Sequence, residues 1–98
     1  MNITKDKFYV YTLLSLKDFN LYTGFTTDLK RRLQEHAKGL VISTKFRTPF
    51  KLIHYEYFAN KEDAKARERF LKSGFGRSQL KQALKRTLNL KPLLLKNM

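Results

Sequence analysis

The chain contains no cysteine, only two histidines and only eight acidic residues. The lack of cysteine excludes disulfide bonds and cysteine-ligated zinc, and two histidines are a poor basis for a dedicated zinc site. The sequence also has no glycine-rich Walker loop and no Gly-x-Ser-x-Gly motif. Nucleotide hydrolysis and serine-hydrolase chemistry therefore have no support.

Long apolar runs are missing as well. The opening residues, MNITKDKF, lack the apolar core of a signal peptide, and no stretch approaches the length of a membrane span. Together with the missing cysteine, this favours the cytoplasm and a protein without a membrane partner. No motif predicts a small-molecule cofactor, and no pattern predicts an oligomeric state.

The residues that are abundant are basic and aromatic. Twenty-one Lys and Arg against eight Asp and Glu give a formal net charge of +13, which attracts polyanions such as nucleic acid. Solubility or a ribosomal neighbourhood would be simpler reasons for this charge. Eight Phe, five Tyr and a hydrophobic fraction of 42% are enough for one small core in 98 residues.

Three segments have the composition of strands. The aromatic and β-branched run FYVYTLLS predicts a strand at residues 8–15, and turn formers at 17–20 lead to a second strand at 20–25. The two should form a hairpin. A third strand is predicted at residues 50–58, after a basic connection at residues 40–49.

Three helices are predicted between and after these strands. The first begins at a Thr26 or Thr27 cap and ends at Gly39, with an inward stripe of Leu29, Leu33 and Ala37. The second runs from an Asn60 cap to about Lys72, where residues 73–76 break it. The third covers roughly 77–88. Its inward residues are Leu80, Ala83, Leu84 and Leu88.

The order ββαβαα predicts an α+β fold, with a small three-stranded antiparallel sheet flanked by three helices. One domain should occupy residues 1–98, with a core at about 8–88 and a tail at 89–98.

Two tyrosines and a glycine mark one face of the hairpin. An even loop places Tyr11 and Tyr22 on the same face, although most strand tyrosines only pack. Gly24 follows on that face and leaves an open spot beside Tyr22, or else it allows tight packing against a helix.

Charged residues on the helices are the other candidates. Arg32 and His36 are four apart and lie on one side of the first helix, where they suit phosphate binding and proton transfer, or form a basic exposed face. Arg31 points further round, toward solvent or a phosphate. Glu68 either pairs with Lys72 on the surface or serves as the lone carboxylate of a Mg²⁺ site.

The order of these residues resembles the GIY-YIG nuclease family. The resemblance rests on YVY at 9–11, YTG at 22–24, Arg32, His36 and Glu68, and it spans about residues 8–88. The stretches DLKRRLQEH, STKFRTPFKLIHYE and AKARERFLKSGFGR are similar to those of the small single-domain bacterial members. Tyr9 replaces the glycine of the first motif and Thr23 the isoleucine of the second. An asparagine of some members has no counterpart, since Asn89 lies too far along.

The resemblance implies a role for each matched residue. Tyr11 and Tyr22 would lie near the attacking water, Arg32 would stabilise charge on the phosphate, and His36 would assist proton transfer. Glu68 would hold one divalent ion, Mg²⁺ or Mn²⁺. Further contacts with nucleic acid are expected from Gly24, Arg31, Lys45, Arg47 and Lys72.

The implied function is a Mg²⁺-dependent endonuclease that hydrolyses DNA, with low or structure-directed specificity, in DNA repair or recombination. RNA is a second possible substrate. The alternative is a basic module of the same fold that binds DNA or RNA without cleaving it.

Overall fold

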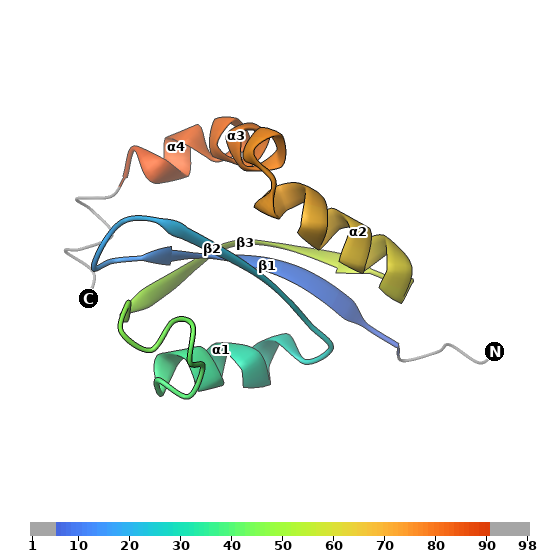
Figure 1. Cartoon of the computed structure of the whole chain (residues 1–98), viewed down its shortest axis with the longest axis horizontal. Coiled ribbons are helices and arrows are strands. Elements are labelled where there is room, and N and C mark those ends of the chain that lie inside the picture. The colour runs from blue at the N-terminus through green and yellow to red at the C-terminus, as the bar shows by residue number, and fades with distance from the viewer. Residues whose placement is uncertain (1–5, 91–98) are drawn as a thin grey trace.

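A single antiparallel sheet organises the protein, which is described here by a computed structural model covering residues 6–90. Its strands are β1 (Phe8–Ser15), β2 (Leu21–Thr26) and β3 (Phe50–Phe58). β1 lies in the middle and pairs with both neighbours (Figure 1). The first and third strands have the predicted bounds, and the second begins and ends one residue later than predicted.

Helices cover the two faces of the sheet unequally. α1 (Leu29–Ala37) lies against one face, and α2 (Lys61–Lys72), α3 (Gly74–Ala83) and α4 (Lys85–Leu88) lie on the other (Figure 1). We call these the α1 face and the α2 face. The predicted α+β fold and its ββαβαα order are confirmed, and α4 is a short addition that follows a break at Leu84.

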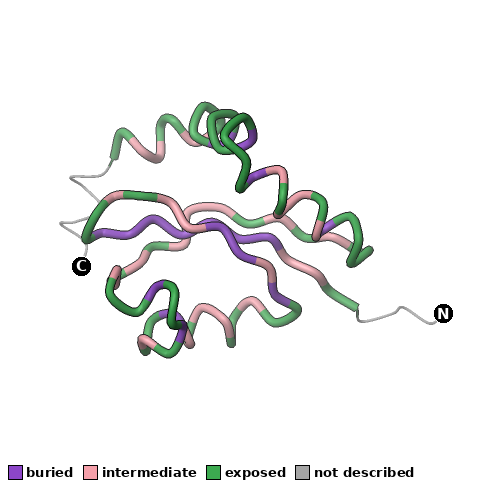
Figure 2. The backbone as a smooth tube through the Cα atoms, viewed as in Figure 1, coloured by how far each residue is buried: buried purple, intermediate pink, exposed green. Residues whose placement is uncertain are grey.

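The apolar core lies on the α2 face. Side chains alternate along a strand, so Val10 of β1 points to this face and packs against Ala64, Leu71 and Leu80 of the helices. Val10 and its β1 neighbours form a continuous buried stretch in the middle of the protein (Figure 2). Partly buried aromatic residues, among them Phe25 and others from the edge strands, complete the cluster.

The cap of α1 differs from the prediction. Asp28, rather than Thr26 or Thr27, caps the helix, and its carboxylate accepts a hydrogen bond from the Arg31 amide at 3.0 Å. Thr26 is the last residue of β2, and its hydroxyl accepts a hydrogen bond from the Asp28 amide. Gly39 ends the helix as predicted, with a φ of +72° that suits glycine.

The predicted inward stripe of α1 is only partly covered. Leu29 and Leu33 are half-buried and Ala37 is exposed, so the last residue of the predicted stripe is not covered. The only buried residue of the helix is His36. α1 therefore packs through a polar side chain more than through its leucines.

The junction of α2 and α3 also corrects the prediction. Asn60 caps α2 as predicted, but the break is confined to Ser73, whose hydroxyl accepts a hydrogen bond from the Gly76 amide and caps α3. A side chain at Gly76 would collide with the carbonyl oxygen of Phe70. This glycine permits two helices to approach closely and does not break one. Ala83, predicted to point inward, is exposed.

Most of the predicted tail, residues 91–98 of 89–98, lies outside the described residues. No helix within residues 6–90 is long and apolar enough to cross a membrane.

Candidate active site

Tyr11 lies at the centre of the α1 face and is fully buried. It pairs across the sheet with Gly24, and its ring occupies the space where a side chain at that position would be. The predicted open spot beside Gly24 is therefore wrong, because the Tyr11 ring fills it. Gly24 makes room for the phenol, and its contact with nucleic acid stays a prediction.

Tyr22 shares this face, as predicted. It pairs with Leu13, the next residue after Tyr11 on the same side of β1, and the rings of Tyr11 and Tyr22 have centroids 6.3 Å apart. His36 contacts both, with centroid distances of 5.6 Å and 5.2 Å. Thr23, the departure from the second motif, points the other way, is buried, and places its hydroxyl 3.5 Å from that of Thr12.

A chain of hydrogen bonds passes through the Tyr11 phenol. The Tyr11 oxygen lies 2.8 Å from Nε2 of His36, and Nδ1 of His36 lies 2.8 Å from the Thr44 hydroxyl. Thr44 donates to the Val41 carbonyl, so it accepts from the N–H at Nδ1. Nε2 then carries the lone pair and accepts a hydrogen bond from the Tyr11 hydroxyl. This assignment follows from the partners of each atom.

Burial keeps both groups of this pair neutral at pH 7. Burial, followed by the charge of Arg32, lowers the pKa of His36 to about 4. Burial also raises the pKa of Tyr11 to about 12, against a hydrogen bond from Arg32 that lowers it. A neutral imidazole beside a neutral phenol is the state in which His36 can take the phenolic proton.

The two neighbouring arginines of α1 have different surroundings. Nε of Arg32 donates to the Tyr11 oxygen at 3.4 Å, and Nη1 pairs with Glu35 at 3.0 Å. The bond to Tyr11 raises the pKa of Arg32. Arg31 is exposed and lies 3.9 Å from Asp28. We call Tyr11, Tyr22 and His36 the tyrosine cluster. Only Arg32 contacts it, as the sequence predicted.

Glu68 approaches this cluster from α2. Its carboxylate accepts a hydrogen bond from Lys72 at 2.9 Å and lies 3.9 Å from Lys65, so the predicted surface pair with Lys72 forms. Its side chain is nevertheless only 14% exposed, and its charge contributes to raising the pKa of Tyr11. The lone carboxylate is thus close enough to Tyr11 to act on it electrostatically.

A single carboxylate fits a magnesium ion that keeps most of its water. Mg²⁺ is commonly held by one or two carboxylates together with waters and substrate phosphates. No group of three or more acidic, His or Cys side chains that could hold a metal occurs within residues 6–90. Glu68 is suited to a magnesium site with one carboxylate, and a cation there would replace its contacts with Lys65 and Lys72.

A basic cleft opens beside Tyr22 at the edge of β2. Its lining comes from the hairpin, β2, the loop before β3, α2 and α3. The residues are Asp18, Asn20, Leu21, Tyr22, Thr23, Arg47, Lys72 and Arg77. Two of the predicted binding residues, Arg47 and Lys72, therefore lie beside a predicted catalytic tyrosine. Lys45 does not line the cleft, and its amine lies over the Phe46 ring.

Arg47 also holds the cleft wall together. Its guanidinium binds the Asp18 carboxylate at 2.9 Å, and this hydrogen bond lowers the pKa of Asp18 to about 2. Lys72 is paired in the same way, with Glu68 at 2.9 Å, and Arg77 is the third cation of the cleft. Sequence reasoning assigned no role to Arg77 or Thr44, although both lie in stretches that resemble the family, because the residues that they lie beside belong to other segments of the chain.

The family is shown by comparison with known proteins. The family model of the GIY-YIG catalytic domain matches residues 7–82. A UPF0213 protein of Streptococcus pyogenes (serotype M5, strain Manfredo) is 44% identical over 78 residues, which cover 79% of this chain and 84% of that protein. A UPF0213 protein of Clostridium perfringens (strain 13) is 43% identical over 65 residues, or 65% of this chain and 69% of that protein.

A solved structure is also similar to this chain. It is the solution NMR structure of a UPF0213 protein from Bacillus halodurans, with 39% sequence identity and a TM-score of 0.52. The match covers 79% of this chain and 84% of that protein's chain. The fold and the tyrosine cluster define a GIY-YIG catalytic domain, and the chain belongs to this nuclease family. Its relatives named above are the small UPF0213 proteins.

Proposed function

We propose that the protein is a metal-dependent endonuclease that hydrolyses phosphodiester bonds in DNA. The observation that carries the proposal is the Tyr11 phenol, which is bonded to both Arg32 and His36 inside a domain of a nuclease family. Packing alone does not require this arrangement, since a phenylalanine would fill the same space without burying an oxygen.

The proposed proton path starts at a water that would reach the Tyr11 oxygen, buried in this structure, when the Arg32 side chain turns to the substrate phosphate. The water gives a proton to the Tyr11 oxygen while the phenolic proton passes to Nε2 of His36, and the resulting hydroxide forms a bond to phosphorus. The bond from phosphorus to the leaving oxygen breaks, and solvent returns a proton to that oxygen. Tyr22, whose ring contacts His36, supplies a second hydroxyl that can orient the water.

Substrate binding makes His36 a better base in this scheme. The charge of Arg32 is one of the causes that lower the pKa of His36. A phosphate bound at Arg32 would offset that charge and so raise the pKa of His36, while burial, the larger cause, would continue to lower it. Arg32 then stabilises the negative charge that develops on the phosphate, through a guanidinium already oriented by Tyr11 and Glu35.

Glu68 would hold the metal, one Mg²⁺ or Mn²⁺. When bound, the ion would supply a Lewis acid that polarises the phosphate and offsets charge on the leaving oxygen. Glu68 must exchange its bond to Lys72 for the ion, which would free the Lys72 amine for a phosphate in the adjoining cleft.

The cleft residues Arg47, Lys72 and Arg77 would bind the backbone phosphates of the strand. Such contacts position a nucleic acid without reading its sequence, so we propose low or structure-directed specificity. A cytoplasmic role in DNA repair or recombination suits an enzyme of this kind. RNA and non-catalytic binding by the basic surface are the competing possibilities.

A cleavage assay tests the proposal. Duplex, nicked, flap, junction and single-stranded DNA, and one RNA, would be incubated with the full chain in Mg²⁺, in Mn²⁺ and in EDTA. Metal-dependent cleavage of at least one DNA is expected. Tight binding to all of these substrates with no cleavage in either metal would instead assign the protein to the non-catalytic module.

A further inference from the structure

A second group of three tyrosines lies on the α1 face, beside the tyrosine cluster of the candidate active site. Tyr9 of β1 pairs with Tyr57 of β3, and Tyr11 pairs with Tyr55. The ring of Tyr9 contacts those of Tyr55 and Tyr57 edge to face, with centroids 6.1 Å and 5.8 Å away. We call Tyr9, Tyr55 and Tyr57 the tyrosine platform.

The platform is open to solvent. Tyr55 is 52% and Tyr57 is 54% exposed, and Tyr9 is half-buried. β3 is an edge strand, and α1 lies against its beginning, where the His36 ring is 6.0 Å from that of Phe50. Tyr55 and Tyr57, further along β3, stay exposed. Tyr9 is also the residue that replaces glycine in the first family motif, so the platform gains a ring where the motif has no side chain.

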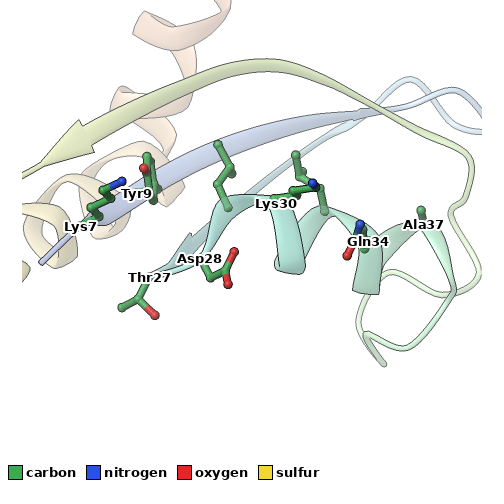
Figure 3. A pocket seen from close by; sticks show the side chains of 9 residues that line it. Lys7, Tyr9, Thr27, Asp28, Lys30, Gln34 and Ala37 are labelled. Atoms are coloured by element: carbon green, nitrogen blue, oxygen red, sulfur yellow. The ribbon is translucent and has the colours of Figure 1, made fainter. Parts of the chain in front are cut away.

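A groove runs between the platform and α1. Tyr9 and Lys7 form one wall, and α1 with the residues before it forms the other (Figure 3). The α1 wall is largely apolar, because the half-buried Leu29 and Leu33 face the groove. The hollow has a volume of about 780 Å³, which is large enough for a flat organic group such as a nucleobase.

The charge around the groove favours an anionic occupant. Lys7 and Lys30 contribute two ammonium groups to its lining. The acidic residue that lines it, Asp28, caps α1 and lies 3.9 Å from Arg31, so its charge is already partly offset. A lining of apolar and aromatic side chains with two lysines suits a strand whose bases stack and whose phosphates are negative.

We propose that the tyrosine platform and this groove bind unpaired nucleotides of the nucleic-acid substrate by stacking. A duplex buries the faces of its bases, so only single-stranded segments can use such a surface. The platform adjoins the catalytic phenol, since Tyr55 lies directly opposite Tyr11 in the sheet. The proposal rests on the proposed function and narrows its substrate class to DNA with a single-stranded segment beside the cleavage point.

Binding measured in EDTA tests the platform apart from cleavage. Fluorescence anisotropy would give the affinity of the full chain for labelled oligo-dT and for a random-sequence duplex of the same length. The double variant Tyr55→Ala/Tyr57→Ala should bind oligo-dT about tenfold or more weakly, because loss of a stacking ring typically costs about 5- to 150-fold. Duplex affinity should change less than twofold.

Matched variants separate stacking from folding and from charge. Tyr57→Phe keeps the ring and should keep oligo-dT affinity. Phe75→Ala removes a ring that is even more exposed, at 69%, from α3 on the other side of the sheet, and should have no effect. The salt dependence of the remaining binding should be unchanged in the double variant, because no charge is removed.

NMR of the unaltered protein gives a readout that needs no variant. Aromatic proton shifts of Tyr9, Tyr55 and Tyr57 should move on addition of oligo-dT and stay in place on addition of duplex. Equal losses for oligo-dT and duplex, or unmoved aromatic shifts, would overturn the proposal. Self-association in analytical ultracentrifugation that the double variant abolishes would assign the platform to a second copy of the chain.

The two proposals fail in different ways. A protein that binds oligo-dT through the platform but cuts no DNA would retain this site and lose the nuclease assignment. The double variant could instead cut flaps and single strands at the parent rate and bind oligo-dT with unchanged affinity. That result would overturn the platform proposal and leave the nuclease assignment in place.

Discussion

The two faces of the sheet bury side chains in different ways. On the α2 face, Val10 meets Ala64, Leu71 and Leu80, and the contact is entirely apolar. On the α1 face, Tyr11, His36 and Thr44 are buried just as completely, but each has a polar atom that needs a partner. No buried side-chain nitrogen or oxygen within residues 6–90 lacks a hydrogen bond.

The difference separates stability from chemistry. Apolar packing tolerates any side chain of similar volume, whereas a buried polar chain fails when one partner is removed. Burial stabilises the apolar side chains of the α2 face, whereas on the α1 face burial shifts the pKa values of Tyr11 and His36. Variants on the two faces should therefore change different measured quantities.

The largest loss of stability is expected on the α2 face. Leu71 is 1% exposed, and Leu71→Ala should lower the free energy of unfolding by about 2–5 kcal/mol, through lost burial and the cavity left behind. Leu71→Met, the control, should cost less than about 1.5 kcal/mol. Urea unfolding measures both. A loss below 1 kcal/mol for Leu71→Ala would show that this face is loosely packed.

On the α1 face, the largest effect should be on rate. Arg32→Ala should lower turnover by on the order of 10²–10³, the typical cost of removing one oriented charge-stabilising donor. Arg31→Ala removes the same charge from the exposed side of α1 and should change turnover only slightly. Single-turnover cleavage with bound substrate compares the two. Equal, mild losses would mean that α1 is merely a basic face.

The α1 face should also make stability depend on pH. The pKa of His36 is about 4 in the folded protein and about 6.5 when unfolded, so between these values the unfolded chain binds more protons. Stability from the neutral His36 is complete above pH 6.5 and falls as the pH drops to 4, by at most about 3 kcal/mol.

Comparison with a variant separates the contribution of His36 from that of the carboxylates, which also titrate in this pH range. Unfolding free energies of the parent and of His36→Gln would be compared at several pH values from 4 to 7, and their difference should shrink as the pH falls. His54→Gln, which changes a half-exposed histidine bound to Glu56, should leave the steep fall in place. A difference between parent and His36→Gln that does not vary with pH would contradict the assigned burial.

A smaller effect is expected at Thr44. Thr44→Val keeps the shape but removes the acceptor for the N–H at Nδ1 of His36, which should cost about 1–3 kcal/mol of stability. The buried imidazole would also lose the bond that fixes its tautomer, so turnover should fall with it. Thr44→Ser restores a hydroxyl and should recover most of both. A Thr44→Val variant with parental turnover would mean that Tyr11 and Arg32 alone orient His36.

The sequence was sufficient for the strands because their signal is local. Alternation and aromatic content predicted β1 and β3 to the residue, and the even hairpin loop placed Tyr11 and Tyr22 on one face. Arg32 and His36 followed from helical spacing once α1 was assigned. These features depend on short-range geometry that a pattern can express.

The parts that could not be predicted depend on contacts between distant segments. The sequence leaves an open spot or tight packing as alternatives at Gly24, because only the register with β1 reveals that the Tyr11 ring lies over it. It predicts a break across residues 73–76, but Gly76 serves the close approach of two helices. Thr44 gave no signal in the sequence, since its role depends on a loop folding back onto His36.

The most direct test of the central claim is cleavage by Glu68→Gln. The substitution keeps the shape and helix propensity but removes the charge that a hard cation requires. Folding should persist, since the pair with Lys72 contributes only about 0.3–0.5 kcal/mol, and DNA affinity should hold or rise slightly on the more basic surface. Glu62→Gln, which removes an exposed charge from the first turn of the same helix, is the matched control.

The account predicts that Glu68→Gln abolishes metal-dependent cleavage, with little rescue by excess Mg²⁺ or Mn²⁺, while Glu62→Gln cuts as the parent does. Cleavage by Glu68→Gln at near the parent rate would contradict the metal site and the enzyme assignment that depends on it.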